Sequence, residues 1–160
     1  PNASKYFSFV MLLFLSHSLF AQNTKREKME QLNYLVGEWV GTSAIYENGE
    51  IVKEGVAYEK ISYDMEKSIL VIELNTEFLQ LHTVILYNEE TQQYEYHRFA
   101  KTGAATYPAE FKDGQLIVWR DKRTRFFFRS TPGGGFQEYG EKLVDGEWIR
   151  TFEDNFKNTQ

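Results

Sequence analysis

Gly37-Glu38-Trp39-Val40-Gly41 is the stretch of sequence that decides the fold of this chain. It is a tryptophan bracketed by glycines, and the spacing of the apolar residues changes at this point. Before it, Met29, Leu32, Leu35 and Val36 recur at helical spacing, which predicts about three turns of helix with one apolar side. After it, apolar and polar residues alternate with a period of two, as in half-buried β-strands. The motif therefore marks the junction between a short helix and a β-domain.

Regular turn signals divide the rest of the chain into about ten strands. The sharpest signals are Asn48-Gly49, Asp113-Gly114 and Asp145-Gly146, because glycine can take the positive φ that tight hairpin turns require. Consecutive hairpins predict an antiparallel meander, and closing the meander removes its two unpaired edges. We expect an all-β fold, a ten-stranded antiparallel up-and-down β-barrel, with neighbouring first and last strands and the helix capping one end. The strands are predicted at about residues 38–47, 53–62, 68–76, 79–87, 93–100, 104–111, 115–120, 122–130, 136–144 and 147–156.

The first 21 residues differ in composition from the rest of the chain. Lys5 supplies a single positive charge, residues 6–20 are almost wholly apolar, and Ala21 ends the run. This pattern is typical of a secretory signal peptide, and the apolar stretch is shorter than the roughly 20 residues that a membrane helix needs. We expect residues 1–21 to be a signal peptide and residues 22–160 to be one exported domain, periplasmic or secreted, with no membrane span once the leader is removed.

Composition narrows the range of partners. A chain of 160 residues closes a single core, and without cysteine no disulfide can support it. The net charge of -5 argues against nucleic acid as a partner, because affinity for phosphate comes from clustered Lys and Arg. In the densest basic stretch, Arg125 and Arg129 alternate with phenylalanines, which predicts that these arginines lie on the outer wall of the barrel.

Residues 35–41, followed by about ten hairpin strands, resemble the opening of the lipocalin-like and fatty-acid-binding-protein-like barrels. The chain looks closest to bacterial secreted proteins of the DUF1579 type, and the resemblance covers residues 30–157. It implies a barrel that holds a ligand in its lumen, with the tryptophan closing one end beneath the pocket, so that Trp39 is mainly a core residue. Haem-binding relatives ligate iron through a histidine late in the chain. No histidine follows His97 here, so we expect no haem. We expect no other cofactor either.

Alternation along the last strand predicts an arginine inside the barrel. Taking the more apolar face as inward places Arg150 in the lumen with Phe152 and Asp154. A guanidinium cannot lose its proton, so a buried arginine needs an anion or several acceptors. That anion is either an internal carboxylate, such as Asp154 or Glu138, or the carboxylate of an apolar ligand.

Other side chains can complete such a ligand site. On the fifth strand Tyr94, Tyr96 and Arg98 share one face, and both faces of this strand are mixed in polarity. The resemblance adds that fatty-acid-binding barrels use an Arg-x-Tyr pair on their last strand, which Arg150-Thr151-Phe152 matches without the hydroxyl. The candidate ligand-binding residues are therefore Arg150, Arg98, Tyr96, Tyr94, Trp39 and Phe152.

Three functions remain open from the sequence. The first is an exported barrel that binds a small apolar or amphipathic molecule, including one that bears a carboxylate. The second is a non-catalytic envelope or interaction protein with a filled lumen, which uses an outer face such as the stripe of Arg123, Arg125 and Arg129. The third is an isomerase or cyclase, which requires His97 within hydrogen-bond reach of a carboxylate in the lumen.

Catalytic signatures are sparse. The chain has no cysteine nucleophile and no Gly-x-Ser-x-Gly elbow. His82 and His97 are the only histidines beyond the leader, and neither has the short spacing to carboxylates that metal sites commonly show. We assign no catalytic residue and no metal ligand, and we leave the ligand identity and the oligomeric state open.

Overall fold

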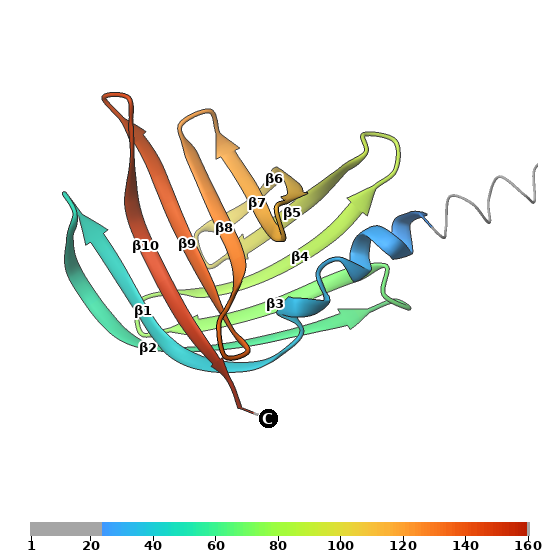
Figure 1. The fold of residues 1–160 in the computed structure, drawn as a ribbon, viewed down its shortest axis with the longest axis horizontal. Helices are drawn as coiled ribbons and strands as arrows, with labels where there is room; N and C mark the ends of the chain where they lie inside the picture. The colour runs from blue at the N-terminus through green and yellow to red at the C-terminus, as the bar shows by residue number, and fades with distance from the viewer. Residues whose placement is uncertain (1–23, 160) are drawn as a thin grey trace, which may run out of the picture.

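The protein is a closed antiparallel β-barrel. A computed structural model describes residues 24–159, so the predicted signal peptide over residues 1–21 lies outside the described residues. Ten strands follow one another around the barrel in chain order, and β1 pairs with β10 to close it (Figure 1). This confirms the predicted fold class and the neighbouring first and last strands. The strands are β1 (Gly37–Glu47), β2 (Glu50–Asp64), β3 (Ile69–Thr76), β4 (Gln80–Asn88), β5 (Gln93–Ala100), β6 (Gly103–Lys112), β7 (Gln115–Asp121), β8 (Thr124–Thr131), β9 (Gly135–Val144) and β10 (Glu147–Asn158).

Three of the hairpin turns have the backbone that their sequences predicted. In Asn48-Gly49, Asp113-Gly114 and Asp145-Gly146 both residues have positive φ, with values between 51° and 87°. Two successive positive φ angles define the type I′ turn, whose twist matches that of the flanking strands. Local turn chemistry therefore sets the register of the β1–β2, β6–β7 and β9–β10 hairpins.

The glycine-tryptophan motif closes the barrel. A Cβ atom on Gly41 would lie 1.7 Å from the carbonyl oxygen of Asn155 on β10, so only glycine allows the two strands to approach this closely. Trp39 is buried and its indole nitrogen donates a hydrogen bond to the carbonyl oxygen of Leu35 at 2.8 Å. The motif thus joins the last strand to the first and ties the preceding segment to the barrel.

The N-terminal segment covers one end of the barrel. Residues 24–30 form an α-helix, and a turn leads into the 3-10 helix η1 (Asn33–Leu35) (Figure 1). The predicted helix is confirmed but is shorter than expected, because the chain tightens at η1 and is extended from Val36 onward. Met29, Leu32 and Leu35 are fully buried, which contributes about 6 kcal/mol of gross hydrophobic stabilisation at about 2 kcal/mol each.

Tyrosine hydroxyls fasten this segment to the barrel. Tyr63 donates a hydrogen bond to the carbonyl oxygen of Met29, and Tyr94 donates one to that of Lys28, both at 2.6 Å. Tyr34 donates in the opposite direction, to a carbonyl oxygen of β8 at 2.7 Å. The carbonyl oxygens of Lys28 and Met29 also accept backbone hydrogen bonds from Gln31 and Leu32, so the tyrosines add a second bond to each and tie the helix end to the barrel wall.

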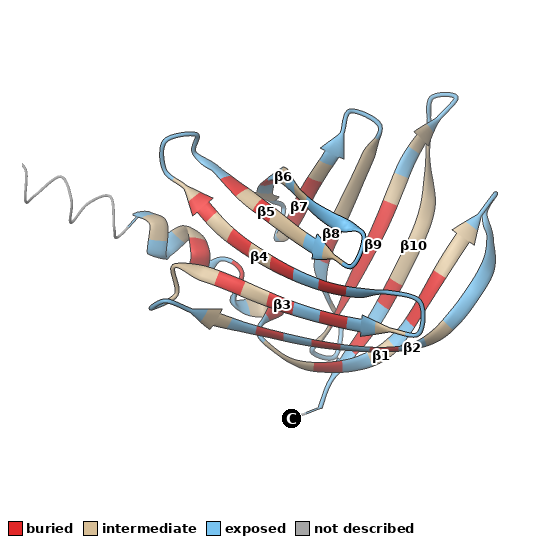
Figure 2. Cartoon of the chain, turned by 180° about the vertical axis from the view of Figure 1, so that it is seen from behind, coloured by how far each residue is buried: buried red, intermediate tan, exposed pale blue. Residues whose placement is uncertain are grey.

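The half of the lumen next to the helix is filled with side chains. Aromatic rings make close contacts there, with Phe136 edge-on to Trp39 at 4.8 Å between ring centres and stacked on Phe156 at 4.7 Å. Buried and exposed residues alternate along β4, as Figure 2 shows, which is the pattern of one face on the core and one in water.

Within residues 24–159 no helix is long and apolar enough to span a membrane.

Candidate functional site

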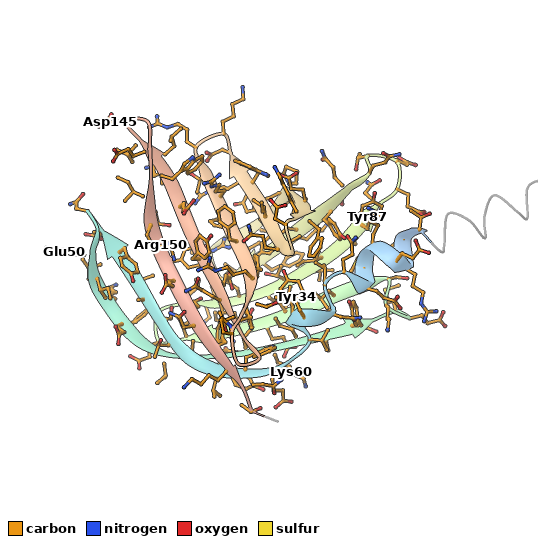
Figure 3. The ribbon with its side chains drawn as sticks, in the orientation of Figure 1. Tyr34, Glu50, Lys60, Tyr87, Asp145 and Arg150 are labelled. Carbon is orange, nitrogen blue, oxygen red and sulfur yellow. The ribbon has the colours of Figure 1, made fainter. Side chains whose placement is uncertain are left out.

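A cavity of about 600 Å³ occupies the half of the lumen that lies away from the helix. Figure 3 shows Glu50 and Asp145 on hairpins at this end, whereas Tyr34 and Tyr87 lie beside the N-terminal helix. The rim is formed by residues in and next to the β3–β4 and β7–β8 turns, namely Thr76, Phe78, Leu79, Arg120, Asp121 and Thr124. Small-molecule sites usually enclose about 300 to 1,000 Å³, so a cavity of this size can hold a small ligand.

The walls of the cavity are mainly apolar. Phe126 and Phe152 pack against each other with ring centres 5.7 Å apart, and Tyr107 meets Phe126 edge-on at 6.4 Å. Aliphatic side chains from three other strands complete the wall, namely Ile45, Leu74 and Leu81. A surface of this kind favours hydrocarbon over water.

The prediction that Arg150 points into the lumen is wrong. The register between β10 and β9 shifts between Arg150 and Phe152, so Thr151 is an extra residue that forms a β-bulge. A bulge reverses the alternation on either side of it, which keeps Phe152 inside and turns Arg150 outward. Gly140 on β9 makes room for the bulge, since a Cβ atom there would lie 2.3 Å from the ring of Phe152.

Arg150 is satisfied on the outer wall. Its guanidinium lies 3.8 Å from the ring centre of Tyr139 and pairs with Glu153. Neither internal partner considered from the sequence, Asp154 or Glu138, makes this ion pair. Its anion is instead Glu153, on the same outer face of β10.

The predicted outer arginines are also held by their own neighbours. Arg125 forms an ion pair with Glu141 at 2.8 Å and lies 3.8 Å from the ring centre of Trp148. Arg129 donates two hydrogen bonds to the side-chain oxygen of Gln137, at 2.6 and 2.9 Å. Their outward orientation is as predicted, and their charges are already engaged.

The remaining candidate residues fall into two groups. Arg98, Tyr96 and Phe152 line the cavity. Trp39 and Tyr94 do not, because they belong to the packed half of the lumen, where each hydrogen-bonds to the segment that covers the barrel end. The structure therefore places three of the six candidate residues at one site, and Arg150 is not among them.

Two buried carboxyl groups, Glu138 and Asp154, lie at the floor of the cavity with a third, Glu59, buried close to them, and the alternation of single strands does not predict this cluster. Asp154 on β10 stands directly opposite Ser43 on β1 and Glu138 on β9. Glu59 on β2 is 0% exposed and both of its carboxyl oxygens lack a hydrogen-bond partner. Asp154 is 3% exposed and its Oδ1 also lacks a partner. Glu138 and Asp154 line the cavity.

Burial shifts the protonation of this carboxyl cluster, Glu59, Glu138 and Asp154. Loss of water raises the pKa of Asp154 to about 6, while the hydrogen bond from Ser43 acts in the opposite direction. Burial first, and then the neighbouring carboxylates, raise the pKa of Glu59 and of Glu138 well above the ordinary value. Burial likewise raises the pKa of Tyr96, and the charge of Glu138 adds to this, so the phenol stays a neutral donor. The floor thus contains acceptors whose charge is costly while they remain unpaired.

The sequence contained one signal for this cluster. Glu59 lies between Ala57 and Ile61 at a spacing of two, so an acid shares the apolar, inward face of β2. The sequence suggests Glu138 and Asp154 only as partners for Arg150. Their convergence depends on the pairing of β9, β10 and β1, which no local pattern reveals.

The acid–base hypothesis through His97 is wrong. Its ring contacts Glu95 at 2.9 Å and Thr106 at 3.0 Å, and all three lie on the outer face of β5 and β6. It cannot reach the carboxyl cluster inside the barrel. In the described part of the chain, residues 24–159, no group of three or more His, Asp or Glu side chains is arranged to hold a metal ion.

Comparison with known proteins adds no narrower assignment. No protein-family model matches the chain, and no curated protein matches its sequence. The resemblance to DUF1579-type proteins accordingly stays a prediction. The architecture itself, ten antiparallel strands closed in sequential order with a short helix against one end, is consistent with the lipocalin-like and fatty-acid-binding-protein-like barrels.

Proposed function

We propose that this barrel binds a small apolar or amphipathic molecule in the open half of its lumen. The observation that carries the proposal is a cavity of about 600 Å³ whose wall is more apolar than polar, next to a half that is densely packed. Protein interiors are normally close-packed, and apolar wall that stays in contact with water forgoes the stabilisation that burial would give. A chain that fills one half of its lumen with aromatic rings and leaves the other half open is best explained by an occupant.

The energetics allow a useful affinity. Transfer of ten methylene groups from water to the apolar wall is worth about 8 kcal/mol at about 0.8 kcal/mol each. Part of this gain is offset by the loss of translational and rotational freedom on association. What remains is compatible with a dissociation constant in the micromolar range, to which polar contacts would add.

The polar group of an amphipathic ligand has two possible partners. Three cations, Arg98, Arg120 and Lys142, line the wall and the rim, whereas the carboxyl cluster lies at the floor. Arg98 keeps a carboxylate-bearing ligand among the candidates although Arg150 does not contribute. Export of the protein and kinship with DUF1579-type secreted proteins, both argued from the sequence, belong to this proposal as well.

Calorimetric titration with decanol, a neutral amphipathic probe, tests the proposal. The wild-type protein should bind decanol, and Leu81→Trp should weaken binding at least about tenfold, because Leu81 lines the cavity and the larger ring occupies its space. Phe99→Trp is the matched control, since Phe99 is 46% exposed on the outer wall of β5, and it should leave the affinity unchanged. Absence of decanol binding to the wild type, or equal affinity in both variants, would contradict a lumenal site.

The cavity argues against the filled-lumen alternative. The outer arginines on which an interaction surface would depend already have partners, Arg125 with Glu141 and Arg129 with Gln137. No specific observation therefore favours an interaction protein over a ligand-binding barrel.

A further inference from the structure

We propose that the cavity floor recognises a cationic amine on the ligand through the carboxylates of Asp154 and Glu138. This inference rests on the proposed function and specifies the ligand class: an amphipathic amine, with its hydrocarbon part against the apolar wall and its ammonium group at the floor. Such an orientation reverses the one expected from the sequence, in which an arginine received an anionic head group.

The placement of the two carboxylates carries the argument. Asp154 and Glu138 are direct cross-strand neighbours on β10 and β9, and both point into the lumen. Side chains opposite each other in an antiparallel pair have Cβ atoms about 5 Å apart, and like charges in that position destabilise the sheet. Without a partner the pair avoids this repulsion by keeping a proton, as the raised pKa of Glu138 indicates, and a cation between the two groups would favour the ionised form of both.

The orphaned oxygen atoms point to the same ligand. Oδ1 of Asp154 has no hydrogen-bond partner although the residue is 3% exposed and lines the cavity. An ammonium group has three N–H donors and no acceptor, so it can serve several carboxyl oxygens at once. A hydroxyl has one donor and a carboxylate has none, so neither matches the floor as well. Glu59, which is 0% exposed and does not line the cavity, is a third acid close enough to interact electrostatically with both members of the pair.

The cations of the site do not neutralise the floor. Arg120 and Lys142 are exposed to solvent near the rim, where water and salt screen their charge. Arg98 is half-buried, and its charge acts on the hydroxyl of Tyr96. Among residues 24–159 none of the ion pairs joins one of these cations to Asp154 or Glu138. A buried carboxyl oxygen without a hydrogen-bond partner gains more binding free energy from a ligand than a solvated, salt-screened cation does. The site therefore favours an amine over an anion.

Calorimetry with three probes of equal chain length tests the inference. Decylamine, decanol and decanoate share one hydrocarbon tail and differ in charge. At neutral pH the wild type should bind decylamine at least about tenfold more tightly than decanol, because a hydrogen bond to a charged group is worth more than a neutral one. The double variant Glu138→Gln/Asp154→Asn should lose this preference and keep its affinity for decanol within about threefold. Glu73→Gln, which removes an exposed acid from the outer face of β3, should retain the preference.

The outcomes separate the inference from the proposed function. Equal binding of amine and alcohol, or tightest binding of decanoate, overturns the amine site and leaves the ligand-binding barrel in place. Failure of all three probes to bind overturns both. Persistence of the amine preference in the double variant also refutes the assignment to these carboxylates. Urea unfolding checks that the double variant is folded, and Asp154→Asn alone, which should lose at least part of the preference, is the second variant if it is not.

Discussion

Replacement of Asp154 by asparagine should stabilise the ligand-free protein at neutral and higher pH. The side chain is 3% exposed, and Asn has nearly the same shape, so it can still accept the hydrogen bond from the Ser43 hydroxyl. What the substitution removes is a charge that the lumen does not solvate. The variant therefore isolates the electrostatic cost of one member of the carboxyl cluster.

The magnitude follows from the pKa of Asp154. Burial is the main cause that raises this pKa from 3.8 to about 6, and one pKa unit is worth about 1.4 kcal/mol. The ionised carboxylate therefore lowers the free energy of unfolding by about 3 kcal/mol. Because the folded state has the higher pKa, it binds more protons than the unfolded state between these two values. Stability thus falls as the pH rises from about 4 to about 6 and stays lower above that range.

Urea unfolding at two pH values measures the effect. At about pH 8, Asp154→Asn should raise the free energy of unfolding by about 3 kcal/mol, equivalent to roughly 6 to 12 °C in Tm for a chain of this size. At about pH 4 most of this advantage should disappear, since the wild-type carboxyl is then largely protonated. Asp145→Asn is the matched control, because Asp145 is exposed in the β9–β10 turn, where Asn fits as well as Asp.

Two results would refute the reasoning. The first is a variant that is no more stable than the wild type at about pH 8, which would mean that water or a bound cation already compensates the charge. The second is an advantage of equal size at both pH values, which would show that packing and not ionisation is responsible. Asp145→Asn should show neither a large gain nor a change with pH.

Three further variants test the fold and the corrected site. Gly41→Ala should lower the free energy of unfolding by more than about 3 kcal/mol or prevent folding, because the added Cβ would lie 1.7 Å from the Asn155 carbonyl oxygen. A near-neutral result in urea unfolding would exclude a tight approach of β1 and β10 at this position. Tyr94→Phe should lower the free energy of unfolding by about 1 to 2 kcal/mol and speed hydrogen exchange in residues 24–30, since it loses the 2.6 Å hydrogen bond to the Lys28 carbonyl oxygen. Unchanged exchange would contradict the anchoring role of Tyr94. Arg150→Ala should leave decanol affinity within about twofold while lowering stability by about 1 kcal/mol, and a larger loss of affinity would return this arginine to the ligand site.

Much of the fold could be predicted because its determinants are local. The Asn-Gly and Asp-Gly turns require only the backbone preferences of two residues, and the structure has positive φ at each of them. Gly41 shows that a single residue type can also indicate a long-range contact. Only glycine fits at this position, because β10 lies directly against β1 there. The apolar periodicity of residues 29–36 predicts the helix but not its end before η1, because that transition depends on how the segment docks against the barrel.

The site was predicted only in part, and the error has an identifiable cause. Strict alternation places Arg150 and Phe152 on one face, yet the bulge at Thr151 separates them. A bulge arises from the pairing of two strands, here with Gly140 opposite, and the sequence of β10 by itself does not reveal it. The residues assigned from strands without irregularities, Tyr96 and Arg98 on β5, do line the cavity.

The amino-acid sequence alone determined the class of this protein: a meander of ten strands, its principal turns and the helix that covers one end. These follow from periodicity and turn chemistry, which act over a few residues. Only the tertiary structure decided that Arg150 lies on the outer wall and that Glu138 and Asp154 meet at the floor of an open cavity, with Glu59 buried close to them. The physical reason is that barrel closure brings β2, β9 and β10 around one lumen, and the charge, burial and partners of a side chain there depend on residues distant in the chain.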